Sequence, residues 1–191
     1  VEEDLLLLSG VGEAGLTRSV TTTTRARFPW LFVNVLTAFL AAAVIGFFKG
    51  TIEQMVAAAV LMPIVASMGG NAANQTVAVA VRAIATHTLT PANAARIVLN
   101  ELLVGGANGL LFAIIVGVVG AVWFDSPELG LVFGLAMVIN LLAAALAGIL
   151  IPLGLDRAGV DPAVASSVFV TTVTDVVGFF VFLGLVTLLL L

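Results

Sequence analysis

The sequence has 191 residues, of which 61% are hydrophobic and only 9% are charged, and its formal net charge is −4. A soluble domain of this size would carry about 25% charged residues, so the composition excludes a soluble globular domain and favours a protein embedded in lipid. The sequence contains no cysteine, which excludes disulfides and thiolate metal sites.

Five segments are long and apolar enough to cross a membrane. Uncharged runs occupy residues 28–48, 54–81, 102–124 and 129–155, and a fifth segment, 162–191, carries only the charge of Asp175. Each reaches the ~20 residues that a helical span needs. The sequence therefore predicts an all-α membrane protein with five transmembrane helices, formed by residues 28–191.

The segment before the first span, residues 1–27, holds four of the eleven acidic residues and a run of threonines. It begins with Val1 and has no basic stretch ahead of a short apolar core, so it does not have the pattern of a signal peptide. We expect it to be a cytoplasmic lead-in, a connector to a further N-terminal part of a longer protein.

The basic residues predict the orientation in the membrane. With the N-terminus in the cytoplasm, all six arginines lie inside, and only Lys49, between the first two spans, lies outside. Cytoplasmic loops carry an excess of Lys and Arg. We therefore expect a multi-pass protein of the plasma (inner) membrane with a cytoplasmic N-terminus and an external C-terminus.

The second span is unusually polar. Pro63 lies in its interior and leaves the carbonyl of Ala59 without a helical donor. Gly69 and Gly70 allow another segment or a hydrated solute to approach the backbone closely. A helical repeat places four further residues on one face, namely Ser67, Asn71, Asn74 and Gln75. This pattern favours the wall of a polar cavity; the alternative is a stripe that only joins helices by hydrogen bonds.

The third span carries small residues at four-residue intervals, which predict a helix-packing face: Gly105, Gly109, Ala113 and Gly117. Asn108 lies beside this stripe. Glu101 lies near the cytoplasmic end, where it can reach the membrane surface or meet Arg96. We interpret Asn108 and Glu101 as structural, with a place at a pore mouth as the alternative for Glu101. The fourth span has Asn140 in its middle.

The fifth span contains the most informative residue, Asp175. A charged residue at the centre of a membrane helix costs roughly 3 kcal/mol or more, and such residues usually face a protein interior or a water-filled path. Thr171 and Gly178 lie on the same helical face. Asp161 and Pro162 predict the start of this helix, with Asp161 as the N-cap. Asp161 lies fourteen residues before Asp175, hence on nearly the same face and ~21 Å away along the axis.

The polar residues disfavour catalysis and favour a path for cations. An aspartyl protease would need a second carboxylate at mid-membrane. A zinc protease would need an H-E-x-x-H pattern, but His87 is the only histidine and lies in a loop. We therefore expect no enzyme. A carboxylate among hydroxyls, carboxamides and freed carbonyls supplies the hard oxygen ligands that Mg²⁺ and Ca²⁺ take; Mn²⁺ or a proton path stays open.

Several stretches together resemble the MgtE family of magnesium transporters. They are found at 27–42, 62–86, 140–153 and 161–190, and read "RFPWLFVNVLTAFLAA", "MPIVASMGGNAANQTVAVAVRAIAT", "NLLAAALAGILIPL" and "DPAVASSVFVTTVTDVVGFFVFLGLVTLLL". The resemblance covers about 25–191. It implies a homodimer with five transmembrane helices per subunit and a pore along the two-fold axis that passes Mg²⁺ down its gradient.

The resemblance also implies roles for particular residues. Asp175 corresponds to the family's mid-pore metal ligand, and Asp161 to a metal contact at the start of the same helix. We expect lipid and a divalent cation, but no nucleic acid, as partners. The expected pore-lining residues are Pro63, Ser67, Gly69, Gly70, Asn71, Asn74, Gln75, Thr171, Thr172 and Gly178.

Family members commonly carry a cytoplasmic Mg²⁺-sensing part before the first span, and residues 1–27 are too short to form it. We therefore expect a pore that is unregulated, regulated by another chain, or cut from a longer protein. Two alternatives to a Mg²⁺ channel remain: an exporter or antiporter coupled to Na⁺ or H⁺, and a membrane anchor or assembly module that transports nothing.

Overall fold

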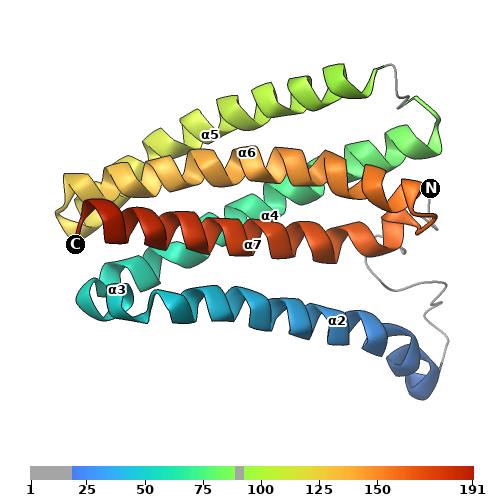
Figure 1. Ribbon diagram of the computed structural model, residues 1–191, viewed down its shortest axis with the longest axis horizontal. Coiled ribbons are helices and arrows are strands. Elements are labelled where there is room, and N and C mark those ends of the chain that lie inside the picture. The colour runs from blue at the N-terminus through green and yellow to red at the C-terminus, as the bar shows by residue number, and fades with distance from the viewer. Residues whose placement is uncertain (1–18, 89–92) are drawn as a thin grey trace.

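The computed structural model describes residues 19–88 and 93–191 (Figure 1). Within these ranges the chain is helical, and five helices are long and apolar enough to span a membrane. The predicted fold class is confirmed. The helices are α2 (Val20–Phe47), α3 (Lys49–Gln54), α4 (Val56–Ala85), α5 (Ala94–Phe124), α6 (Pro127–Arg157) and α7 (Pro162–Leu189).

Two boundaries of the first span differ from the sequence prediction. The helix α2 begins at Val20 rather than at residue 28, because Ser19 caps it by accepting a hydrogen bond from the Thr22 amide. The loop expected around Lys49 contains the short helix α3. Of the predicted lead-in 1–27, residues 1–18 lie outside the described residues.

The last two helices, α6 and α7, begin where a side chain accepts a hydrogen bond from one of their first free amides. Ser126 accepts a hydrogen bond from the Leu129 amide (3.2 Å) and starts α6. Asp161 accepts one from the Ala163 amide (2.9 Å), and Pro162 takes the first turn of α7. The capping role predicted for Asp161 is confirmed. Between α5 and α6 the chain turns at Asp125, which is in the left-handed region with φ 50°.

Helix α6 is the centre of the structure. It contacts α4, α5 and α7, and most of its apolar stretch is buried. Helix α2, in contrast, contacts only α7 and the short α3, and it lies at the edge of the described helices in Figure 1. Helices α4, α6 and α7 therefore form the packed core, while α2 and α5 are attached to its outside.

Glycine fixes the spacing between α5 and α6. A Cβ added to Gly105 would lie 2.8 Å from the Ala145 Cβ, and one added to Gly117 would lie 3.1 Å from the Gly130 carbonyl oxygen. The packing face predicted from the small-residue stripe of the third span is thus confirmed, and its partner is α6.

The core of α4, α6 and α7 consists of two apolar clusters separated by a more polar layer. One cluster includes Leu61, Phe133 and Phe182; the other includes Val77, Ala144 and Val170. We call the residues between them the central layer, which comprises Gly69, Gly70, Asn140, Thr174 and Gly178. Asp175 lies beside this layer on α7.

Candidate functional site

Asp175 lies half-buried in the middle of α7. Its carboxylate forms no hydrogen bond or ion pair with any residue that the structure describes. Both oxygens are therefore available to a cation or to water. An ionisable group without a partner in a membrane helix needs water, an ion or another protein surface beside it.

Two glycines of α4 bring that helix close to α7 at the level of Asp175. A Cβ on Gly70 would lie 3.8 Å from Thr174 Oγ1 and 3.9 Å from the Thr171 methyl group. These are ordinary van der Waals distances. The closer approach to α7 is at Gly69, where an added Cβ would lie 3.1 Å from the Thr174 Cβ. Asn71, which follows Gly70 on α4, is exposed.

Asn140 joins the three core helices in the central layer. It is fully buried, and its Nδ2 donates to the Val65 carbonyl of α4 (2.8 Å). A Cβ on Gly178 of α7 would lie 2.9 Å from the same nitrogen, and one on Gly69 of α4 would overlap the carboxamide. From the sequence alone, Asn140 is a polar residue in the middle of the fourth span with no predicted role. A lone carboxamide at the centre of an apolar span is the signal that could have identified it.

The polar face predicted for the second span divides in the structure. Asn74 belongs to the contact with α7: Ser167 Oγ donates to its Oδ1 (3.0 Å), and its Nδ2 donates to the Gly70 carbonyl (2.9 Å). Ser67 and Asn71 are exposed. Their hydroxyl and carboxamide groups form no hydrogen bond within the described part of the chain. They remain available to solvent or to another chain.

Gln75 lies on the other side of α4, towards α5 and α6. It lines a cavity of about 220 Å³ together with Glu101 and Asn108. Thr76 Oγ1 donates to Glu101 Oε2 (3.2 Å), so the described partner of Glu101 is Thr76 rather than Arg96. This cavity is separate from the α4–α7 contact beside Asp175.

Three further residues predicted to line the pore or bind metal, Thr172, Pro63 and Asp161, have no contact with Asp175 among the described interactions. Thr172 donates to the Val168 carbonyl (2.7 Å) and lines a mostly apolar hollow with residues of α6. Pro63 is exposed within a continuous α4. Asp161 is exposed at the start of α7, where its carboxylate already accepts a backbone hydrogen bond.

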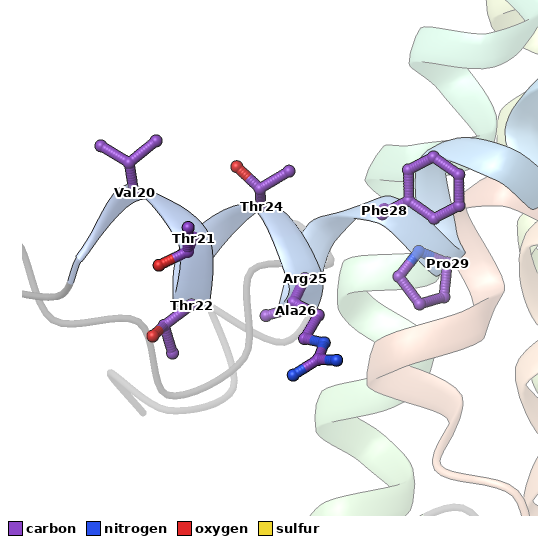
Figure 2. Close-up of a pocket in the computed structure, with 8 residues that line it drawn as sticks. All are labelled: Val20, Thr21, Thr22, Thr24, Arg25, Ala26, Phe28 and Pro29. Carbon is purple, nitrogen blue, oxygen red and sulfur yellow. The ribbon is translucent and has the colours of Figure 1, made fainter.

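Two further features of the described chain bear on cation binding. No group of three or more His, Cys, Asp or Glu side chains is close enough to hold a metal among the residues that the structure describes. Figure 2 shows a hollow at the N-terminal turns of α2, where the described lining consists of eight residues of that helix and its only charged group is Arg25. The positive charge of Arg25 disfavours a cation beside the described lining.

Comparison with known proteins gives consistent matches. The model of the MgtE family, described as a divalent cation transporter, matches residues 62–185. Two curated proteins, both called magnesium transporter MgtE, are similar over most of the chain. The protein from Enterococcus faecalis is 31% identical over 95% of this chain and 40% of its own length. The protein from Thermus thermophilus is 35% identical over 86% of this chain and 36% of its own length. The chain thus spans well under half the length of these relatives.

Proposed function

Because the chain belongs to the MgtE family of divalent cation transporters, we propose that it carries Mg²⁺ across the membrane along a path on which Asp175 is the principal ligand. Relatives that match most of the chain are named magnesium transporters, which supports Mg²⁺ as the ion. The observation that carries the proposal is the carboxylate of Asp175, half-buried at mid-span and without a protein partner among the described residues.

The chemistry around Asp175 suits a hydrated Mg²⁺. This ion gives up water reluctantly and is usually held by one or two carboxylates while it keeps several waters. Asp175 supplies the charge. In the proposed path, the hydroxyl of Thr171, one turn earlier on α7, and the exposed carboxamide of Asn71, which follows Gly70 on α4, hydrogen-bond to the ion's waters. Ca²⁺ and Mn²⁺ take similar oxygen ligands, so selectivity depends on the fit of the water shell.

The exposure of Asp175 supports a homodimeric pore. In a single chain the carboxylate is partly exposed on a helix whose length and hydropathy are those of a membrane span. Lipid cannot solvate a carboxylate, so another protein surface or water must cover it. A second copy related by a two-fold axis would do so, and it would bring a second Asp175 to the ion.

The proposal also specifies which end of the path faces the cytoplasm. With the arginines inside, the N-terminus is cytoplasmic and the start of α7 lies at the inner surface of the plasma membrane. Asp161 would then stand at the inner mouth, ~21 Å from Asp175 along the helix. In this arrangement residues 28–191 form the pore domain, and residues 1–27 lead into it from the cytoplasm.

Replacement of Asp175 tests the proposal. In proteoliposomes containing a Mg²⁺-sensitive dye, Asp175→Asn should reduce Mg²⁺ influx at least tenfold, because asparagine keeps the shape but removes the charge that holds the ion. The matched control is Asp125→Asn, the same change at an exposed turn whose left-handed backbone asparagine tolerates. The control should retain influx within about twofold, which is about 0.4 kcal/mol of barrier height.

The oligomeric state of each variant, measured by cross-linking and size-exclusion chromatography, separates lost transport from lost assembly. Normal Mg²⁺ influx in Asp175→Asn would show that Asp175 is not the principal ligand. Absence of Mg²⁺ flux in the unaltered protein would favour a membrane module that transports nothing.

A further inference from the structure

The cavity lined by Gln75, Glu101 and Asn108 lies between α4, α5 and α6, separate from Asp175. Its volume is about 220 Å³, and its polar lining consists of Gln75 and Thr76 from α4 and Glu101 and Asn108 from α5. Leu141 and Ala145 of α6 also line it. Since a water occupies ~30 Å³ in the liquid, the cavity has room for an ion and several waters.

The cavity contains a carboxylate whose charge no described residue neutralises. Glu101 is half-buried, and its one hydrogen bond comes from the neutral hydroxyl of Thr76 (3.2 Å). Within residues 19–88 and 93–191, no Lys, Arg or His forms an ion pair with it. A carboxylate in this position needs a counter-charge or water.

The two carboxamides in the cavity have no protein partner either. Gln75 and Asn108 form no hydrogen bond within the described ranges, and both are exposed side chains of membrane-spanning helices, α4 and α5. Such side chains are expensive in lipid unless their oxygen and nitrogen atoms are satisfied. Together with Glu101 and Thr76 they present only hard oxygen ligands and hydrogen-bond donors.

We propose that this cavity binds a second hydrated divalent cation, with Glu101 as its charged ligand and Gln75 and Asn108 in contact with the ion or its waters. One carboxylate with neutral oxygens and retained waters is a ligand set that Mg²⁺ accepts. The site does not depend on the path beside Asp175, because its polar side chains come from α5 and from the side of α4 that faces α5.

A cation in this cavity would join two helices that otherwise barely touch. Helix α5 packs on α6, and its direct contact with α4 is slight. An ion held by Glu101 and Asn108 on one side and by Gln75 on the other would bridge α4 and α5. Binding should therefore stabilise the folded chain as well as occupy the site.

The test counts bound Mn²⁺, a paramagnetic divalent probe, by electron paramagnetic resonance on the complete purified chain in detergent. Glu101→Gln keeps the side-chain shape and should bind one Mn²⁺ per chain fewer than the unaltered protein. Asp175→Asn should retain the ion that depends on Glu101. The control Glu128→Gln removes an exposed acid at the start of α6 and should leave the count unchanged. Added Mg²⁺ should displace the Glu101-dependent ion.

The proposal is wrong if Glu101→Gln binds as many Mn²⁺ ions as the unaltered protein with the same affinity. If that variant does not give monodisperse protein, Gln75→Leu decides instead, since it leaves the carboxylate in place and should weaken the same Mn²⁺ site several-fold; unchanged affinity contradicts the proposal. Transport is judged separately: normal Mg²⁺ influx in Asp175→Asn would overturn the proposed path while leaving the Glu101 count as it is.

Discussion

At the scale of single residues, the two polar groups at mid-membrane have opposite roles. Asn140 is fully buried and donates to the Val65 carbonyl, so it fixes the distance between α4 and α6. Asp175 is half-buried and has no partner in the described chain, so it is available to an ion. Both residues interrupt an apolar span. They differ in burial: Asn140 is fully buried and has a structural role, whereas the half-buried Asp175 is proposed to bind the ion.

A change of one atom at Asn140 should be costly. Asn140→Asp replaces the donor Nδ2 by an oxygen, which then faces the Val65 carbonyl oxygen in a fully buried site. We expect the free energy of unfolding to fall by roughly 3 kcal/mol or more, the cost of a charge at the centre of a membrane helix. The measurement is denaturation of the detergent-solubilised protein.

Asn140→Leu is the comparison. It removes the donor together with Oδ1, which has no hydrogen-bond partner among the described residues, so its loss of stability should be smaller. Equal stability of Asn140→Asp and the unaltered protein would contradict the role of Asn140 as a buried donor.

At the scale of the helix, neighbouring residues can serve different contacts. Asn74 and Gln75 are consecutive in α4, yet Asn74 accepts from Ser167 of α7 and Gln75 lines the cavity towards α5. Consecutive residues of an α-helix point about 100° apart. The predicted polar face of α4 is wide enough to include both Asn74 and Gln75. The two residues have different surroundings because one faces α7 and the other faces α5.

The packing of α6 against α5 gives a second test at this scale. A Cβ on Gly134 would lie 2.9 Å from the Ala113 carbonyl oxygen, a backbone atom that cannot turn away. Gly134→Ala should therefore destabilise the protein by about 1–3 kcal/mol, the usual cost of overpacking. Thermal unfolding in detergent measures the effect.

Gly154→Ala is the matched control on the same helix. Nothing lies within 4 Å of a Cβ at Gly154, so the change should be neutral, or stabilising by up to about 1 kcal/mol through helix propensity. If both alanine variants behaved alike, close packing at Gly134 would not be what holds α5 to α6.

At the scale of the whole molecule, the position of each loop relative to the membrane can be measured directly. The sequence has no cysteine, so any introduced cysteine is a unique label site. Gly50 in α3 and Ala158 between α6 and α7 are both exposed. A membrane-impermeant maleimide should label Gly50→Cys in intact cells and Ala158→Cys only after the membrane is permeabilised, because the arginines are proposed to lie inside.

The cysteine-free protein should take up no label under either condition, which controls for non-specific reaction. Labelling of Ala158→Cys in intact cells, with Gly50→Cys protected, would reverse the proposed orientation. It would also move Asp161 from the inner to the outer mouth.

The five spans, the start of α7 and the polar residues of each span can be predicted from local sequence, because hydropathy, helix caps and proline act within a few residues of one another. Local sequence also singles out Asp175, whose cost in lipid depends only on the apolar run around it. The small-residue stripe of α5 could also be predicted from local sequence. Its packing partner, α6, could not.

Which helices contact one another follows from the packing of the bundle and not from any local pattern. The donor of Asn140 and its acceptor on Val65 are 75 residues apart, and Thr76 and Glu101 belong to different helices. The small-residue contacts that bring α4, α6 and α7 together depend on shape across the bundle, which no local pattern contains. That packing separates the surface around Asp175 from the cavity around Glu101.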